Sequence, residues 1–525
     1  MKTYNTYLLF IFFGCNLSSN SENTDLNDFK FLEIDIVTLN RGYINQDYTI
    51  QEVVQSYIDR INKIDQNGPR LNSIIEINPD AILIAKSLDE ELKTQGPRGY
   101  LHGVPVLLKD NIDTNDKMST TAGSRALEGS RPLKDSKVAE KLRKAGAVIL
   151  GKANLSEWAN FRGKRSTSGW SGISGQTKNP YVLSRNPCGS SSGSGVSVSA
   201  NLTLLAIGTE TNGSIVCPSS VNGVVGIKPT VGLISRSGII PISYTQDTAG
   251  PMARNVQDAA ICLGFLTGVD ENDKKTRASL NNKYDDYTQF LNKDGLNGKR
   301  IGIYIRPLGM NDKVDSLFYK SVELIKEMGA EVIEIRAFSS DETRSHSFQV
   351  MIHEYKDGLN NYFKSLGSKA QIKNLEELIE FNESDSIELK YFNQAYLKLA
   401  QSTEGVKGDK YLNSLLTLKR LSQTEGIDKV MNDNDLDAIV APTGSPSWST
   451  DWFNGDNYYI SSSSPSAWAG YPIVSVPMGN IHGLPVGISF FGRAWSEPTL
   501  IEVSYAFEQS SKARIIPEFH TNDEY

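Results

Sequence analysis

Apolar and polar positions follow a helical period in the first part of the chain. After Thr49, apolar side chains fall on one face, at Ile50, Val53, Val54, Tyr57, Ile58 and Ile61. Thr49 and Glu52 have the spacing of a capping box, so the pattern predicts an amphipathic helix that starts at residue 50. A second helix is predicted in the segment AILIAKSLDEELK, which follows Pro79.

Short apolar runs between such helices predict strands. Residues 104–108 form one run, which ends on Lys109, and residues 147–150 form another. Between them, DSKVAEKLRKA is predicted to be an amphipathic helix closed by Gly146. The order strand, helix, strand recurs at 299–335 as KRIGIYI, residues 314–328 and EVIEI. Alternation of this kind predicts an α/β protein.

Residues 340–430 have a different pattern, because they are polar, tyrosine-rich and largely helical. We interpret them as a region that covers a substrate, and a plain surface layer is an equally good interpretation. The tail returns to strands in DAIVAPT, YPIVSVPMG and PVGISFFG, and then to a helix from Pro498 to about residue 509. No repeat or linker divides the chain, so one large domain is predicted over residues 46–515.

The N-terminus has the pattern of an export signal. Met1-Lys2 precedes the apolar run YLLFIFF, and Gly14-Cys15 comes before a polar tract. Seven apolar residues are too few to span a bilayer, which takes about 20. Residues 1–15 are therefore predicted to be a signal of the lipoprotein type with Cys15 lipidated, and residues 16–45 a tether and N-terminal extension. This places the protein outside the cytoplasm, anchored to a membrane by lipid. An ordinary secretory signal or a buried N-terminal strand are the alternatives.

Composition narrows the range of functions. The chain has 525 residues, 39% hydrophobic and 22% charged, and a net charge of −7, which argues against a nucleic-acid partner. After Cys15, the cysteines are Cys188, Cys217 and Cys262, with no Cys-x-x-Cys or His-x-x-x-His pair. We expect neither a disulfide framework nor a metal site, and we interpret Cys188 and Cys217 as packing residues.

The candidate chemistry lies in residues 188–214, CGSSSGSGVSVSANLTLLAIGTETNGS. Two serine-bearing turns flank the apolar run 204–207, which is predicted to be a buried strand. A linker would not need such a strand, so the serines are expected to be held in place. Lys109 at the end of an upstream strand completes the set of candidates.

At these motifs the chain resembles the amidase signature family. The likeness rests on CGSSSGSG, GTETNGS and GVPVLLKDN, and it extends to IKPTVG at 227–232 and DTAGPM at 247–252. Several motifs in the family's order are far more specific than any one alone. The resemblance covers roughly residues 45–510. It implies one large α/β domain with a mixed, twisted central sheet that helices cover on both faces.

The resemblance also implies a Ser-Ser-Lys triad. Ser214 would be the nucleophile, Ser190, after a cis peptide, the bridging serine, and Lys109 the base. The oxyanion hole would come from the backbone N–H groups of Thr211, Asn212, Gly213 and Ser214. Asn212, Ser192 and Cys188 stand where the family usually has glycine. With QDTAGPM, these departures resemble the peptide-amidase branch more than the tRNA-dependent amidotransferase subunit.

The implied activity is hydrolysis of carboxamides through an acyl-serine intermediate, without metal or organic cofactor. Small-molecule or peptide amides would be the substrates, with C-terminal amides of peptides as the leading class. The pocket walls are expected in residues 340–430 and 461–471.

Side-chain chemistry supports Lys109 as the base independently of the resemblance. A serine hydroxyl becomes a good nucleophile only when a base within hydrogen-bond reach takes its proton. A lysine can do so only when neutral, which requires its pKa to fall by roughly three units, about 4 kcal/mol. The apolar residues 104–108 could remove water from Lys109. Alone, such a lysine is more often a solvated strand end, and Ser190 more often a turn former.

Other functions remain open. Residues 189–193 also match Gly-x-Ser-x-Gly, which would make Ser191 the nucleophile of an α/β-hydrolase-type esterase. That motif needs a preceding strand, whereas LSRNP precedes it here, and no later histidine stands in a telling context. A lipid-anchored binding protein with an amidase-like cleft is a second alternative. A glutamine-amidotransferase subunit with a tRNA-binding partner is a third, but the export signal disfavours it.

Overall fold

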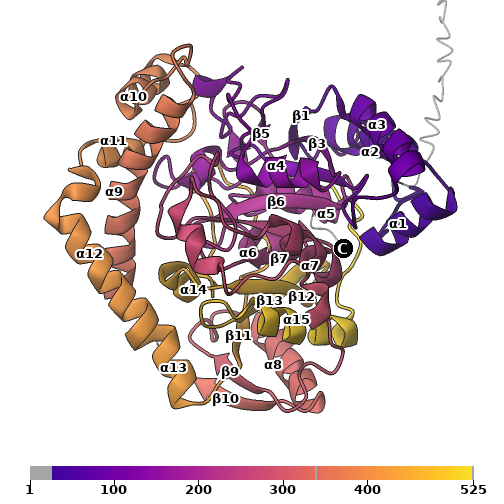
Figure 1. The fold of residues 1–525 in the computed structure, drawn as a ribbon. Coiled ribbons are helices and arrows are strands. Elements are labelled where there is room, and N and C mark those ends of the chain that lie inside the picture. Colours follow the sequence, from indigo (N-terminus) through magenta and orange to yellow (C-terminus); the bar gives the residue numbers. More distant parts are fainter. Residues whose placement is uncertain (1–25, 337–339, 523–525) are drawn as a thin grey trace, which may run out of the picture.

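The computed structural model describes residues 26–336 and 340–522, and the predicted signal with Cys15 lies outside them. An 11-stranded mixed sheet runs through the molecule in the order β1-β3-β2-β6-β8-β7-β12-β13-β11-β9-β10, from top to bottom in Figure 1. The strands are β1 (Ile74–Ile77), β2 (Pro105–Lys109), β3 (Val148–Ala153), β6 (Leu205–Glu210), β7 (Val225–Lys228), β8 (Thr248–Ala253), β9 (Arg300–Tyr304), β10 (Glu331–Ile335), β11 (Ala438–Pro442), β12 (Ile473–Ile481) and β13 (Leu484–Phe491). A small hairpin pairs β4 (Trp170–Ser171) with β5 (Gly175–Gln176). The predicted α/β class, single domain and mixed sheet are confirmed.

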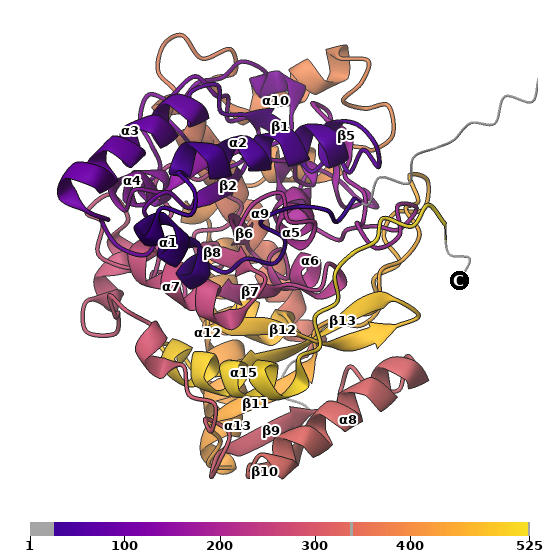
Figure 2. The same cartoon turned by 90° about the vertical axis from the view of Figure 1, so that its right-hand side faces the viewer.

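Helices flank the sheet (Figures 1 and 2). They are α1 (Ile36–Asn45), α2 (Ile50–Arg60), α3 (Ala81–Gln95), α4 (Lys137–Lys144), α5 (Ser192–Ser199), α6 (Val216–Val221), α7 (Val256–Leu266), α8 (Asp312–Glu327), α9 (Asp341–Ser365), α10 (Leu375–Ser384), α11 (Ala395–Gln401), α12 (Asp409–Lys419), α13 (Asp428–Asp433), α14 (Ser464–Ala469) and α15 (Glu497–Ser511). Figure 2 shows α2, α3 and α4 near β1, and α8 and α15 toward the other end of the sheet. None of the helices within 26–336 and 340–522 is both long and apolar enough to cross a membrane.

Local sequence signals explain where these elements begin. Thr49 Oγ1 accepts from the Glu52 N–H at 3.1 Å, and Glu52 Oε2 accepts from the Thr49 N–H at 2.8 Å, which is the predicted capping box of α2. Gly146 has a φ of +83° directly after α4, a backbone conformation in which a Cβ would be strained. β2 runs parallel to both β3 and β6 and ends on Lys109, so that lysine lies at the carboxyl edge of the sheet.

The segment that precedes α2 belongs to the folded domain. The sequence predicts a tether and extension up to residue 45, but Phe31 and the α1 residues Ile36 and Leu39 are buried in the main hydrophobic core. The Asp35 carboxylate caps α1 by accepting from the Thr38 N–H at 2.6 Å. The described part of this extension therefore packs on the sheet domain.

Helices α9 to α13 form an outer layer, which stands at the left edge of Figure 1. Within this layer, the long α9 lies on the side that faces the sheet domain. Its inner face contributes Leu359 and Phe363 to a second hydrophobic cluster, which also contains Trp158 from the sheet domain. The predicted helical character of 340–430 is thus present, with α9 as the element closest to the site.

One element differs from the sequence prediction. The sequence analysis assigns no helix to residues 192–199, which follow the first serine turn, but this segment forms the buried helix α5. Small side chains let this helix lie against neighbouring backbone: a Cβ on Gly193 would collide with the carbonyl oxygen of Ser73. The close approach requires glycine at that position, so a glycine-rich helix has the composition of a loop.

Candidate active site

Lys109 projects from the end of β2 into the protein interior and has no exposed surface. Its Nζ has three polar neighbours: Ser190 Oγ at 2.7 Å, Thr209 Oγ1 at 2.9 Å and the Thr209 carbonyl oxygen at 3.1 Å. A neutral amine has two N–H donors and one lone pair. The two Thr209 oxygens can accept both N–H groups, which leaves the lone pair for the Ser190 hydroxyl proton.

The environment of Lys109 favours its neutral form. Burial lowers the pKa of Lys109 to about 7, against the opposing pull of the Asp247 and Glu210 carboxylates. No carboxylate of the described chain forms an ion pair with its Nζ. Desolvation is therefore the dominant effect, as the apolar approach along β2 suggested.

The two adjacent serines of the first turn have different partners. The Gly189–Ser190 peptide is cis, and Ser190 faces Lys109. The Ser191 hydroxyl donates to the Thr209 carbonyl at 3.1 Å and accepts from the Thr209 N–H at 3.2 Å. Ser191 is completely buried and its hydroxyl is fully used by strand β6. This geometry does not suit Ser191 for the exposed nucleophile of a Gly-x-Ser-x-Gly elbow.

Ser214 lies in the second turn and is partly exposed. Its carbonyl oxygen accepts from the Ser191 N–H at 3.1 Å, which places the two turns in direct contact. Ser214 Oγ makes no hydrogen bond with a residue of 26–336 or 340–522. The hydrogen bond between Ser190 and Ser214 that a proton transfer would use is therefore not formed in this structure. Hydrogen bonds of this kind commonly tighten only when substrate binds.

The turn before Ser214 presents backbone donors. Gly213 has a φ of +86°, which gives the chain a sharp bend. The N–H groups of Asn212, Gly213 and Ser214 donate to no acceptor within the described part of the chain. Free N–H groups that converge at one turn suit the stabilisation of an oxyanion.

Three consecutive side chains of this turn hold it in place, and each of them bonds to a different part of the chain. Glu210 Oε2 accepts from the N–H groups of Ile215 and Val216, at 2.8 and 3.1 Å. The Thr211 hydroxyl donates to Asp247 at 2.6 Å. Asn212 Oδ1 accepts from the Ser463 hydroxyl at 2.8 Å, and Asn212 Nδ2 donates to Ser464 Oγ at 3.2 Å.

Ser214 opens into a cavity of about 220 Å³, which we call the serine cavity. Its walls include Phe161, Ser168, Met351, Trp448, Asp456 and Tyr458. Cys188 and Cys217 also line it and form a disulfide, with their Cα atoms 6.1 Å apart. This pairing corrects the interpretation of both cysteines as packing residues. The bond joins the residue before the first turn to the helix after the second.

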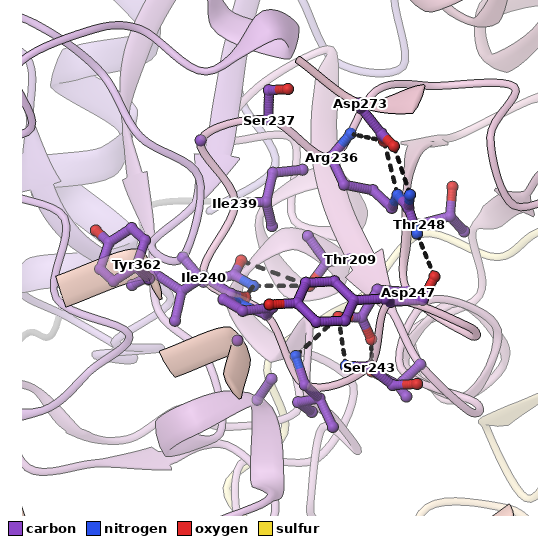
Figure 3. Close-up of a pocket in the computed structure, with 18 of the residues that line it drawn as sticks. Thr209, Arg236, Ser237, Ile239, Ile240, Ser243, Asp247, Thr248, Asp273 and Tyr362 are labelled. Carbon is purple, nitrogen blue, oxygen red and sulfur yellow. Dashed lines mark hydrogen bonds and ion pairs between the residues drawn. The ribbon is translucent and has the colours of Figure 1, made fainter. Parts of the chain in front are cut away.

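A second cavity of about 380 Å³ adjoins the first (Figure 3). Both are lined by Ala159, Thr211 and Ile242, so these side chains separate the two spaces. Asp247 lies at this boundary and accepts from the N–H groups of Ile242 and Ser243, each at 2.8 Å. Burial raises the pKa of Asp247 to about 6, although these hydrogen bonds favour its ionised form.

The cavity walls differ in part from those predicted. Met351 of α9 lines the serine cavity, and Gly358 and Tyr362 of the same helix line the second one. The other wall, expected in residues 461–471, comes from 448–458 instead. Ser463 and Ser464 of the expected segment instead form hydrogen bonds with the Asn212 side chain.

Two functional features were not found from the sequence. Thr209 supplies two of the three neighbours of Lys109, and strand register could have revealed it, because Leu108 pairs with Ile207. The disulfide could have been inferred once the two turns were placed together, since a cysteine flanks each of them. Lys109, Ser190 and Ser214, by contrast, were predicted from the sequence, and the structure places Lys109 beside Ser190 and the turn of Ser214 against the turn of Ser190. The described residues contain no cluster of His, Cys, Asp and Glu that could hold a metal ion.

Comparisons with known proteins agree with this arrangement. The amidase family model matches residues 52–501. The structure of native peptide amidase from Stenotrophomonas maltophilia superposes with a TM-score of 0.90 at 46% identity, over 94% of this chain and 100% of that chain. A probable amidase of Arabidopsis thaliana is 42% identical over 502 residues, 94% of this chain and 92% of the relative. A glutamyl-tRNA(Gln) amidotransferase subunit of Thermoanaerobacter pseudethanolicus is 32% identical over 484 residues, 89% and 94% of the respective chains.

Proposed function

This chain belongs to the amidase family, and from that premise we propose that it hydrolyses carboxamides through an acyl-serine intermediate on Ser214. Lys109 is the base and Ser190 the proton bridge. The observation that carries the proposal is the position of Lys109 Nζ, 2.7 Å from Ser190 Oγ, with its two N–H groups taken up by Thr209.

The first half of the reaction forms the acyl-enzyme. Ser214 Oγ attacks the amide carbon while its proton moves to Ser190, which passes its own proton to Lys109. The backbone N–H groups of residues 211–214 stabilise the negative oxygen that develops. The C–N bond then breaks, and the nitrogen takes the proton back along the same path and leaves as ammonia.

The second half repeats these steps with water. Water attacks the acyl carbon, its proton travels through Ser190 to Lys109, and Ser214 receives a proton as the carboxylic acid departs. Neither half changes the protonation of Lys109 overall. The same neutral amine therefore serves both steps.

Peptides that end in a carboxamide are the leading substrate class. The support is the 46% identity with a peptide amidase over nearly the whole of both chains. By comparison, identity with the amidotransferase relative is 32%. A peptide amide also fits a serine cavity that is open to solvent at Ser214.

Ammonia release from a C-terminal peptide amide tests the proposal. Protein without residues 1–15 should release ammonia, and Lys109→Ala should lower kcat by about 10²- to 10⁴-fold, the usual contribution of a general base. Lys152→Met, which removes a second fully buried lysine on the neighbouring strand β3, is the matched control for burial. Activity that survives in Lys109→Ala would refute the lysine-base mechanism.

We also propose export with lipidation at Cys15, from the N-terminal pattern. The Cys188–Cys217 disulfide is in keeping with an oxidising compartment. The native protein should partition with membranes, whereas Cys15→Ser should lose the lipid mass by mass spectrometry. An unprocessed, unlipidated N-terminus in the native host would refute the anchor.

A further inference from the structure

An exposed group of aromatic side chains borders the serine cavity. Trp448, Asp456 and Tyr458 line that cavity, and the chain between them carries Trp452 and Phe453. Phe453 is 88% exposed and Trp452 is 37% exposed. We call Trp452, Phe453 and the neighbouring Tyr391 the aromatic ledge. An aromatic side chain as exposed as Phe453 has little role in holding the fold together.

The tip of the ledge has a defined shape. Asp451 Oδ1 accepts from the N–H groups of Phe453 and Asn454, at 2.8 and 2.9 Å. Trp452 Nε1 donates to Gln176 Oε1 at 3.1 Å. These contacts fix the backbone so that Phe453 projects outward, and they lower the entropy that binding would cost.

A distant segment of the chain completes the ledge. The Tyr391 ring, from the loop after α10, lies 4.8 Å from the Trp452 ring between centroids, tilted by 46°. Tyr391 in turn contacts Trp170 of the β4 hairpin edge-on, at 6.1 Å. The ledge is therefore a built surface supported by three parts of the chain.

Two neighbouring residues tie the ledge to the serine cavity. Ser168 lines the cavity and donates to Asp456 twice, from its N–H at 3.0 Å and from its hydroxyl at 2.6 Å. The adjacent Thr167 hydroxyl donates to the Asp451 carbonyl oxygen. Both ends of the segment 451–456 are thus held beside the cavity wall, and the ledge continues that wall outward.

The size of the cavity gives this surface a role. At about 220 Å³ the serine cavity is smaller than sites that enclose a whole drug-sized ligand, roughly 300–1,000 Å³. A peptide of several residues whose terminal carboxamide reaches Ser214 exceeds this volume, so part of its chain, on the N-terminal side of the amide, lies outside the serine cavity. Exposed aromatic rings offer large contact area at a small entropy cost.

We propose that the aromatic ledge binds apolar side chains of a peptide substrate, N-terminal to its carboxamide. This inference rests on the proposed function. The ledge makes the protein selective for peptide amides of several residues over short amides. The selectivity comes from tighter binding and not from a faster chemical step. A second copy of this chain is the rival occupant.

Binding to a Ser214→Ala background separates the ledge from the chemistry. The two probes are N-acetyl-alanine amide and N-acetyl-Leu-Phe-Leu-alanine amide, which share the same terminal group. Calorimetry should show that Phe453→Ser weakens binding of the long amide by about 3- to 10-fold, the range of one aromatic contact, and leaves the short amide unchanged. Trp452→Gln should act in the same direction. Leu416→Ser on α12, 69% exposed, is the matched surface control.

The outcomes are distinct. An unchanged ratio of long-amide to short-amide affinity in both ledge variants would overturn the proposal, as would a long amide that binds no tighter than the short one. If sedimentation shows that the unmutated protein is a dimer and that Phe453→Ser is a monomer, the ledge binds a second copy of this chain. That result would also overturn the proposal. Ammonia release by the unmutated protein tests the proposed function separately, because the binding measurements do not depend on turnover.

Discussion

The two serine turns, at 189–192 and 210–214, touch each other but differ in exposure and in hydrogen bonding. In the first, Ser190 and Ser191 are completely buried, and each hydroxyl has a protein partner. In the second, Ser214 is partly exposed and its hydroxyl has no partner within the described residues. A proton carrier must be shielded from water, whereas a nucleophile must be reachable. The contrast supports the division of roles that we propose.

The same contrast appears in how the turns are held. The first turn leads into the buried helix α5, and the hydroxyls of Ser190 and Ser191 hold it to Lys109 and Thr209. The second is fixed through the side chains of Glu210, Thr211 and Asn212, while its N–H groups at 212–214 find no acceptor in the described chain. Anchoring by side chains leaves the backbone available for the reaction, which is what an oxyanion hole requires.

Removing the nucleophile should give the largest effect. Ser214→Ala should lower kcat by at least about 10⁴-fold, because no neighbouring hydroxyl is placed to replace it as the attacking group. Ser191→Ala should keep most of the activity, since the Ser191 hydroxyl bonds only to Thr209 of β6. Fluorophosphonate labelling read by mass spectrometry checks both variants. Labelling that is lost in Ser191→Ala and kept in Ser214→Ala would reverse the roles of the two turns.

The disulfide tests how strongly the turns depend on each other. Cys188 and Cys217 close a loop with a sequence separation of 29. The double change Cys188→Ser and Cys217→Ser should lower the free energy of unfolding by about 2–4 kcal/mol, mainly by freeing the unfolded chain. Denaturant melts with and without dithiothreitol measure this loss. Reduction should destabilise the unmutated protein and leave the double variant unaffected, and equal sensitivity of both would contradict the prediction.

Sequence reasoning predicted the capping box of α2 and many strands of the sheet, though not β1, β7 or β8, because capping and strand signals are local. Motifs that occur in order singled out Lys109, Ser190 and Ser214, whose catalytic roles stay predictions. Sequence reasoning missed α5, because a helix that needs glycine for close contact has the composition of a turn. It also missed the wall at 448–458 and the disulfide, which depend on contacts between distant segments. Those contacts follow from the tertiary arrangement of the chain, which the local sequence pattern alone does not encode.

The pH profile should report the buried base. Burial lowers the pKa of Lys109 to about 7 from its usual 10.5, so the base is protonated below that value. We expect kcat/KM to rise about tenfold per pH unit below pH 6 and to level off above pH 8. Asp247→Asn removes a charge that raises this pKa, so it should move the rise to lower pH. A profile with no inflection between pH 6 and 8 would contradict the lysine base.

The free energy of unfolding should also depend on the protonation of Lys109. Between about pH 7 and 10.5 the unfolded chain holds a proton on Lys109 that the folded protein lacks. The contribution of Lys109 therefore makes the free energy of unfolding rise with pH across this range. Comparing urea melts of Lys109→Met and the unmutated protein at several pH values isolates it, because the variant lacks this slope.

The smallest effect is expected at Asn212, and it tests whether side-chain anchoring of the second turn matters for catalysis. Asn212→Ala removes two hydrogen bonds, to Ser463 and Ser464, each worth about 1 kcal/mol. If the turn then relaxes, kcat should fall by about 3- to 10-fold with little change in KM, because the oxyanion forms only in the transition state. Ser463→Ala should give a smaller loss of the same kind. In the double variant the losses should not add, since both changes break one shared contact. Additive losses, or a change confined to KM, would mean that the anchors serve substrate binding and not the geometry of the oxyanion hole.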